Sequence, residues 1–317
     1  MNDIQYNPLL ENLQERTVQE EPLKLIHATT IFKAFDRGSV QEFNGAYSEW
    51  IGDQPLEGVI WNKKLKSKDL DDLPDVFSHK LYIIHDKVYY TIENKKVMKR
   101  ALQSPQAMAQ LVDRLTDSMK TKPVLDLNQK IVEIICEKKN YNDNAWQELS
   151  ADELKIDSLD KAIAVLKMIK TASNAMLEPS SNYNKGYQKP GTTTWNQVIT
   201  NSESRKSQVL TIEPDWLDDL EIHFLADIGN DSDLNPYKIF KEVIRKKLVN
   251  GVKVALHDEK SVAYQVINED GITTEKVFGS GNTKFGYHTT VVGGMIPFTN
   301  SWALVAKEDK GKASSSK

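Results

Sequence analysis

The clearest helical segment of the sequence reads Ser104-Pro-Gln-Ala-Met-Ala-Gln-Leu-Val-Asp-Arg-Leu-Thr-Asp-Ser-Met-Lys-Thr-Lys122. Ser104 is a good helix cap, and a proline at the first helical position loses no hydrogen bond. Apolar residues then recur at steps of three and four, the spacing of one helix face; they are Met108, Leu111, Val112, Leu115 and Met119. We expect these five side chains to form a core face. Pro123 should end the helix, because proline lacks the donor N–H.

Further helices are expected downstream of this segment. The pattern predicts them over residues 125–138, 150–173, 214–220 and 236–249. Ser150 and Glu153 have the spacing of a capping box at the start of the second one. The last one combines apolar positions with a basic run, formed by Lys238, Lys241, Arg245, Lys246 and Lys247. We expect that run to be the solvated face of an amphipathic helix, with nucleic-acid backbone or an acidic neighbouring subunit as alternatives.

Strands are interleaved with these helices. They are expected over residues 80–93, 208–213, 252–256, 261–268 and much of 287–306. Within the first, Asp86-Lys87 divides β-branched and aromatic residues as a hairpin turn would. The order of elements lacks the regular alternation of a doubly wound sheet. The predicted fold class is therefore α+β.

The ends of the chain and one internal segment lack the pattern of a packed core. Residues 1–35 read as an extended arm broken by Pro8 and Pro22. Residues 36–79 read as a protruding loop rich in glycine and in charges of both signs. Its charged tip contains Lys63, Lys64, Lys66, Lys68, Asp71 and Asp72. The tail, residues 307–317, should be disordered.

Composition excludes several classes of protein. The chain has 317 residues, 41 Lys and Arg against 45 Asp and Glu, and one cysteine, Cys136. That cysteine lies in an apolar run and is expected to be a buried thiol. No stretch approaches the ~20 apolar residues of a membrane span, and the N-terminus lacks the charge of a signal peptide. We expect a protein made in a reducing cytoplasm, with about two lobes.

A search for catalytic or ligand-binding chemistry finds little. No phosphate-binding loop, metal motif or nucleophile motif is present, and the six histidines are scattered singly. His257-Asp258 is a weak candidate for a base and its orienting acid, since adjacent strand residues face opposite sides. The acidic cluster Asp215, Asp218 and Asp219 is expected at a helix N-terminus, and Gly279–Gly281 in an ordinary loop. We expect no cofactor, no metal and no catalytic residue.

From residue 80 to residue 306 the sequence resembles the major capsid proteins of small, short-tailed bacteriophages of the Picovirinae type. Val97–Val112 is similar to the approach to that family's long spine helix. Further segments resemble its mid-domain loop, its strand and helix ending in a Leu-Ala step, and its closing strands: Pro179–Thr194, Val209–Ala226, Asn282–His288 and Ile296–Trp302. The resemblance implies the Hong Kong 97-type fold of tailed-phage capsids and encapsulins.

The resemblance also implies a domain plan and a function. The plan is an N-terminal arm (1–35), an extended loop (36–79), a peripheral domain with the spine helix (80–124 and 257–306) and an axial domain (125–256). The implied protein is a structural, non-enzymatic virion subunit that assembles in the host cytoplasm. Its copies form hexamers and pentamers of an icosahedral or prolate shell. Its other expected partners are scaffolding and portal proteins and packaged DNA, held without sequence specificity; no membrane is involved.

Three rival readings stay open at this point. One is an encapsulin-like compartment shell with the same fold and an enzyme cargo. Another is a soluble enzyme of unfamiliar family centred on His257, Asp258 and the loop at residues 279–286. The third is a monomeric phage accessory or adaptor protein.

The charged loop generates the first prediction. We expect Lys63, Lys64, Lys66 and Lys68 to form intersubunit ion pairs with Asp71, Asp72 or their equivalents in neighbouring copies. Each exposed pair contributes roughly 0–1 kcal/mol, but many copies of it would fix the register of a shell. Replacing all four lysines by glutamine should impair assembly, measured by electron microscopy, and leave the circular dichroism of the monomer unchanged. Normal shells from this variant would refute the role.

Overall fold

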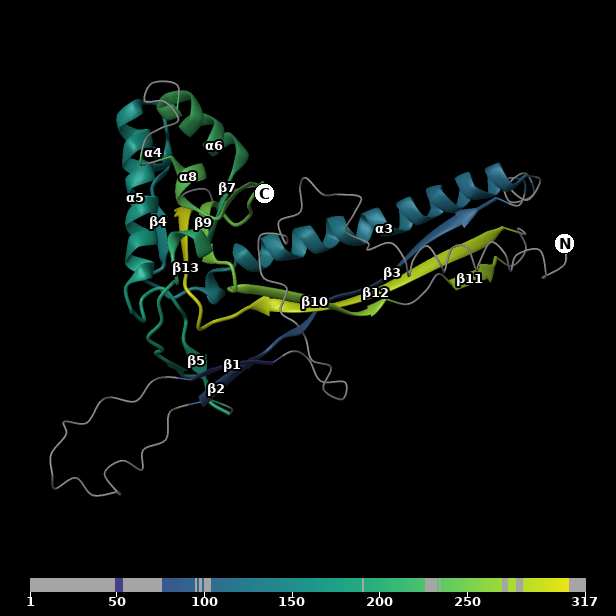
Figure 1. The fold of residues 1–317 in the computed structure, drawn as a ribbon, viewed down its shortest axis with the longest axis horizontal. Coiled ribbons are helices and arrows are strands. Elements are labelled where there is room, and N and C mark those ends of the chain that lie inside the picture. Colours follow the sequence, from purple (N-terminus) through teal and green to yellow (C-terminus); the bar gives the residue numbers. More distant parts are fainter. Residues whose placement is uncertain are drawn as a thin grey trace, which may run out of the picture. The chain divides into compact units, whose positions relative to one another are not determined.

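The structure, a computed structural model, describes residues 49–53, 76–94, 96, 99, 104–189, 191–225, 233, 235–269, 273–277 and 282–307. The chain forms two compact units (Figure 1). Unit 1 includes Tyr82–Ile131 and Tyr264–Gly294. Unit 2 includes Val132–Ala263, the residues that follow Gly294 and the described residues before Tyr82. The described part of the chain therefore begins in unit 2, enters unit 1 at Tyr82, builds most of unit 2, returns to unit 1 and ends in unit 2.

Unit 1 is a four-stranded sheet accompanied by one long helix (Figure 1). Its elements are β3 (Tyr82–Glu93), α3 (Pro105–Ile135, which continues into unit 2), β10 (Val262–Glu269), β11 (Thr273–Lys276) and β12 (Thr283–Met295). β12 is the centre of the sheet, because it pairs with each of the other three strands. Figure 1 shows α3 running alongside β3 and β12.

The pairing of β3 with β12 corrects the predicted hairpin. Eleven antiparallel pairs join the two strands, from Glu93 with Thr283 to Tyr82 with Gly293. Asp86 and Lys87 are not a turn; they lie in mid-strand, opposite Thr290 and Thr289. Both polar side chains have partners there, since Asp86 accepts a hydrogen bond from Thr290 Oγ1 (3.0 Å) and Lys87 binds a carboxylate on α3. Those partners come from distant parts of the chain, so the local pattern favoured a turn.

Helix α3 begins where the sequence predicted and ends later. Ser104 Oγ accepts a hydrogen bond from the Ala107 N–H (3.1 Å), which confirms the cap. The helix then runs through Pro123 to Ile135, so the predicted end at Pro123 and the separate helix over 125–138 are wrong. A proline removes one hydrogen bond of the helical ladder. The buried face continues on both sides of it and offsets that loss; its members are Leu111, Leu115, Met119, Val124, Leu127, Ile131 and Ile135. The side chains of Met108 and Val112 lie outside what the structure describes.

Unit 2 is built on a five-stranded mixed sheet in the order β4-β13-β9-β7-β8. The two outer pairs are parallel, and the two inner pairs are antiparallel. Its strands are β4 (Trp146–Leu149), β7 (Gln208–Ile212), β8 (Glu242–Arg245), β9 (Val252–Asp258) and β13 (Ser301–Ala306). The core lies between this sheet and helices α5 (Leu159–Leu177) and α6 (Pro214–Leu220), where Ile169 and Trp216 pack in one cluster with Leu210 and Leu256.

Shorter elements complete unit 2. β1 pairs with β2, and β5 pairs with β6, each pair antiparallel. A single π-helical turn follows α6. The bounds are β1 (Glu49–Asp53), β2 (Val76–Lys80), η5 (Lys138–Asn140), α4 (Ala151–Leu154), β5 (Tyr187–Gln188), β6 (Trp195–Asn196), η6 (Arg205–Ser207), η7 (Glu221–Leu225) and α8 (Pro236–Ile239).

The helix predicted over 150–173 is two helices, α4 and α5. Its capping box is confirmed, because Ser150 Oγ accepts from the Glu153 N–H while Glu153 Oε2 accepts from the Ser150 N–H (2.8 Å). Lys155 then adopts extended backbone, with φ −76° and ψ 117°, and α5 begins after Ser158. The break places Ile156 in the core, 5% exposed.

The basic helix predicted over 236–249 is wrong. α8 ends at Ile239, and residues Glu242–Arg245 form the edge strand β8 beside β7. The alternation of apolar and polar residues fits a strand as well as a helix, and β7 supplies backbone partners; for instance, Gln208 O accepts from the Lys241 N–H (2.9 Å). The helix predicted over 214–220 and the strands predicted over 208–213, 252–256 and 261–268 are confirmed within one or two residues.

Two leucines of α3 test how this helix is held. Leu115 is 1% exposed and Leu125 is 48% exposed. Leu115→Ala should lower the free energy of unfolding by roughly 2–5 kcal/mol, because it opens a cavity. Leu125→Ala, on the same helix, should lower it by less than about 1 kcal/mol. Urea unfolding of unassembled subunits measures both values, and equal losses would contradict the packing described here.

Candidate assembly surface

The sheet of unit 1 has one apolar face open to solvent. Val88, Tyr90 and Ile92 alternate along β3 and are 59%, 62% and 50% exposed. Alternate residues of a strand point to the same face, so these three side chains form a strip, which we call the bare face. Lys284 on β12 also lies on it, with Nζ 4.6 Å from the centre of the Tyr90 ring. Large apolar side chains gathered in this way are typical of an interaction surface.

The opposite face of the same strands packs toward α3. On β12, Phe285 and Tyr287 are almost fully buried, and on β3 the Tyr89 hydroxyl donates a hydrogen bond to Asp126 Oδ2 of the helix (3.0 Å). Lys87 Nζ binds the same oxygen (2.9 Å), and Lys122 Nζ binds Oδ1 (3.0 Å). We call Asp126, Lys87, Lys122 and Tyr89 the Asp126 cluster. It fixes the helix on the strand by charge-assisted hydrogen bonds.

The Asp126 cluster determines how its members titrate. Burial alone would raise the pKa of Asp126, but the hydrogen bonds from Lys87, Lys122 and Tyr89 outweigh it and lower the pKa to about 2. Burial, then the hydrogen bond to Asp126, raises the pKa of Tyr89 beyond its usual range. Because Tyr89 donates its only proton to Asp126, His85 must donate from Nε2 to the Tyr89 oxygen (2.8 Å). His85 therefore carries a proton on Nε2, and burial, followed by the charge of Lys87, lowers the pKa of its ring.

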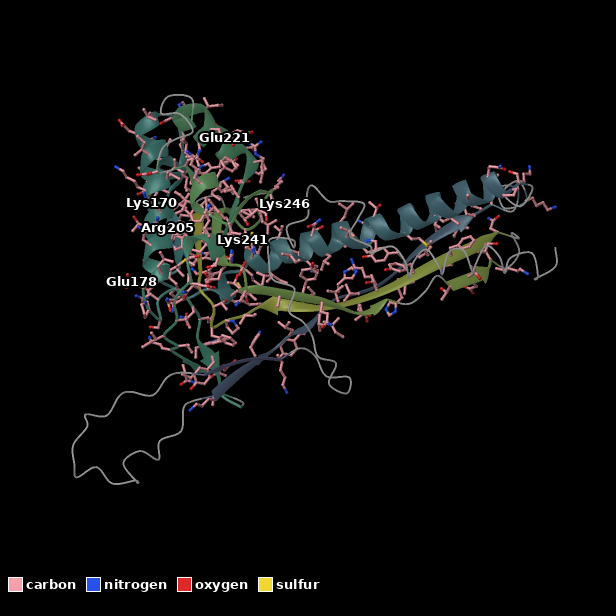
Figure 2. All side chains as sticks on the ribbon, viewed as in Figure 1. Lys170, Glu178, Arg205, Glu221, Lys241 and Lys246 are labelled. Atoms are coloured by element: carbon pink, nitrogen blue, oxygen red, sulfur yellow. The ribbon has the colours of Figure 1, made fainter. Side chains whose placement is uncertain are left out.

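A second charged cluster lies on the surface of unit 2. Arg245 of β8 forms ion pairs with Asp218 of α6 and with Glu221 (3.2 Å) in the π-helical turn. Tyr237 donates a hydrogen bond to Glu221 Oε1 (2.7 Å), and Figure 2 labels Glu221 at this part of the unit. Of the three acids predicted at a helix N-terminus, only Asp215 lies in the first turn of α6. Asp218 and Asp219 lie in its last turn, so the prediction is wrong for them, and Asp218 holds the edge strand. The exposed Ile222, 64% exposed, lies next to this cluster in the chain.

The residues of the enzyme reading do not form a catalytic pair. His257 is fully buried, and Tyr141 OH lies 2.8 Å from its Nε2. Burial lowers the pKa of His257 to about 3. Asp258 follows it on β9 and turns to the other side of the strand, where Oδ2 accepts from the Asn300 N–H (3.2 Å). A base that no solvent or substrate reaches cannot abstract a proton from a substrate.

The structure also shows where some of the other residues highlighted in the sequence lie. Cys136 is buried, as predicted, and burial raises the pKa of its thiol to about 11. The loop residues Lys63, Lys64, Lys66, Lys68, Asp71 and Asp72, and the Gly279–Gly281 loop, lie outside the described residues. Within the part of the chain that is described, no three His, Cys, Asp or Glu side chains converge on a metal position. None of the described helices is both long and apolar enough to cross a membrane.

Solved structures with a similar fold are phage capsids and a related particle. The capsid structure of Staphylococcus phage Andhra matches with a TM-score of 0.60 at 13% identity, covering 92% of this chain and 87% of that chain. The capsid structure of cyanophage P-SCSP1u matches at 0.58 and 9% identity, covering 89% of each chain. A virus-like particle from Pyrococcus furiosus matches at 0.50 and 11%, covering 93% of this chain and 98% of that one. These likenesses define the class of the fold, the Hong Kong 97-type fold of phage capsid subunits.

The sequence defines the family within that class. A model of the Phi29-like phage major capsid protein family matches residues 1–305. The chain therefore belongs to this family, and it is a structural subunit of a phage capsid shell. No curated protein sequence matches the chain. The family match favours the role of a phage capsid subunit over the three rival roles: an encapsulin-like compartment shell, an enzyme and an adaptor protein.

Sequence reasoning missed both the bare face and the Asp126 cluster. The alternation of Val88, Tyr90 and Ile92 was visible, but a turn placed at Asp86 hid its continuity. The sequence placed Asp126 at the start of a separate helix. Nothing in the local pattern indicated that it contacts Lys87 and Tyr89, which are almost 40 residues earlier in the chain.

The Asp126 cluster predicts a pH-dependent stability. The pKa of Asp126 is depressed in the folded subunit, so its stabilising contribution is present above its unfolded pKa of about 4 and is lost as the pH falls toward about 2. Asp126→Asn should lower the free energy of unfolding by about 1–2 kcal/mol at pH 7, since the two lysines are partly screened by solvent. The difference from the unaltered protein should shrink below pH 4, as measured by urea unfolding across pH.

The exposed acid Asp143 provides the control for this prediction. Asp143→Asn should change stability by less than about 0.5 kcal/mol at every pH. A loss in Asp126→Asn that does not depend on pH would mean that packing, rather than charge, holds the helix.

Proposed function

We propose that the chain assembles as hexamers and pentamers into an icosahedral or prolate shell that encloses the double-stranded DNA of the phage. The observation that carries this proposal is the bare face. A shell subunit must present apolar surface to its copies, and Val88, Tyr90 and Ile92 present it on a rigid strand that is fixed from behind by the Asp126 cluster. Its proposed occupant is a second copy of this chain, because the chain belongs to a family of major capsid proteins and a shell brings copies of its subunit into contact.

The division of the chain supports the proposed domain plan. The peripheral domain is proposed over 80–124 and 257–306, and the axial domain over 125–256. Unit 1, with Tyr82–Ile131 and Tyr264–Gly294, likewise combines two separate stretches of the chain, although residues 257–263 and 295–306 of the proposed peripheral range belong to unit 2. The arm (1–35) and the extended loop (36–79) are proposed to lie on neighbouring subunits, with the loop lysines and aspartates forming ion pairs there.

The charges of unit 2 support loose, non-specific contact with DNA. Many of its basic side chains are engaged within the subunit: Lys241 binds Glu259, and Arg245 binds Asp218 and Glu221. Others contact the chain through amides and carbonyls, such as Arg205 with Asn174. Figure 2 labels Lys170, Arg205, Lys241 and Lys246, which lie apart rather than in one stripe. The formal net charge of −4 fits the same role.

Further partners and the place of assembly follow from the proposed role. Scaffolding and portal proteins are the proposed assembly partners, and the host cytoplasm is the proposed site. The proposed subunit has no enzymatic activity and needs no cofactor. The buried His257 supports this part of the proposal.

Size-exclusion chromatography followed by negative-stain microscopy of the purified protein tests the proposal. Closed shells, tubes, hexamers or pentamers are the expected products. If the purified protein remains monomeric at micromolar concentration, both with and without a crowding agent, the proposal is contradicted.

The bare face generates its own prediction. A triple variant, Val88→Thr, Tyr90→Thr and Ile92→Thr, places a residue of high strand propensity at each position and removes the apolar surface. Because the three side chains are exposed, the subunit should lose less than about 2 kcal/mol of folding stability, while the yield of assembled particles should fall at least tenfold. Ile199→Thr, at a position 58% exposed in unit 2, is the control and should assemble normally. Full assembly of the triple variant would exclude the bare face as an interface.

A further inference from the structure

Three hydrogen-bonded polar side chains lie beside the apolar strip of the bare face. Asp86 comes two residues before Val88 on β3, so its side chain points to the same face. His288 and Thr290 of β12 stand directly opposite Val88 and Asp86. Paired residues of neighbouring strands share a face, so all three polar side chains lie on the bare face. We call Asp86, His288 and Thr290 the His288 triad.

The His288 triad converges on one carboxylate oxygen. Asp86 Oδ1 accepts a hydrogen bond from Thr290 Oγ1 (3.0 Å) and lies 2.6 Å from His288 Nε2. A carboxylate can only accept, so His288 Nε2 carries a proton and donates it. The second ring nitrogen, Nδ1, carries a proton in the imidazolium and none in neutral histidine. The ring can therefore gain or lose one proton while its hydrogen bond to Asp86 persists.

The carboxyl group of Asp86 stays charged while the ring titrates. The hydrogen bond from His288, followed by that from Thr290, lowers the pKa of Asp86. With a neutral ring the His288 triad has one negative charge, and with an imidazolium its charges cancel. The side chains of Asp86 and His288 are 55% and 30% exposed, so solvent screens both charges in the free subunit.

Covering the bare face changes which protonation state is favoured. A second copy seated on Val88 and Tyr90 also excludes water from the neighbouring Asp86. A carboxylate that loses its water without an opposite charge is strongly destabilised. A proton on His288 supplies that opposite charge at hydrogen-bond distance.

The other charged groups of unit 1 leave this part to His288. Those on α3 and on the opposite face of β3 are His85, Lys87, Lys122, Asp126 and Lys130. On the bare face, Lys284 stands over the Tyr90 ring, and Glu275 of β11 is its cross-strand partner. The described side chains of β10, those of residues 262–266, include no charged group. His288 is thus the cation that the fold places against Asp86.

We infer that covering the bare face with a second copy is coupled to the uptake of one proton by the His288 triad. The inference rests on the proposed assembly through the bare face and adds its regulation by pH. His288 holds its proton more tightly in the covered state than in the free subunit. Association is therefore strongest at the acid end of the histidine range and weakens as the pH rises through that range.

Assembly measured across pH tests the coupling. The threshold concentration at which particles form is determined by light scattering and sedimentation from pH 6 to pH 8.5. One proton per covered subunit raises this threshold by up to about tenfold per pH unit, and we expect a total rise of at least tenfold. Normal particles with a threshold that does not depend on pH would overturn the inference and leave the proposed function intact. A protein that is monomeric at every pH would overturn both.

Two variants with opposite expected effects assign the pH dependence to the His288 triad. His288→Gln retains a donor for Asp86 but cannot take up a proton, so its threshold should stay high at every pH. Asp86→Asn removes the charge that has to be neutralised, so at pH 8.5 its threshold should be at least threefold lower than that of the unaltered protein. Circular dichroism of unassembled subunits verifies that both variants fold.

A histidine outside the bare face provides the matched control. His223→Gln, at a partly buried position of unit 2, should keep the full pH dependence. If both variants of the His288 triad keep the pH dependence of the unaltered protein, the inference is wrong. It is also wrong if both weaken assembly by the same factor at every pH, because the triad then acts only as a structural contact.

Discussion

The pairing of β12 with β3 is the interaction on which the rest of the structure depends. It joins Glu93 to Thr283, 190 positions apart (283 minus 93), and so closes a loop that contains most of unit 2. Closing so long a loop costs entropy, but the cost grows only slowly with length. The pairing also decides the two faces of the sheet. One face is fixed to α3 through Asp126, and the other keeps Val88, Tyr90 and Ile92 in solvent. The subunit therefore has a packed core of its own but leaves the apolar bare face uncovered.

The sequence correctly predicted the structural features that depend only on residues close together in the chain. Ser104 begins α3 as expected, because a cap and a proline act within one helical turn. The capping box of Ser150 and Glu153 is local in the same sense. Fold class and function were reached through a resemblance in the order of segments, and the family match bears both out.

What the sequence did not predict depends on distant partners. Asp86 and Lys87 look like a turn until Thr290 and Asp126 supply partners for them. Pro123 interrupts a helix in isolation, but the buried residues on both sides of it carry α3 through. Residues Glu242–Arg245 of the basic run form an edge strand because β7 supplies backbone hydrogen-bond partners for them.

Electron cryomicroscopy of particles assembled from the purified protein tests the central claim most directly. The claim is that the bare face exists to be covered by another copy of this chain. The account predicts closed particles in which Val88, Tyr90 and Ile92 lie within van der Waals distance of a neighbouring subunit. Particles in which these three side chains face solvent would contradict it, even if the shell itself is closed.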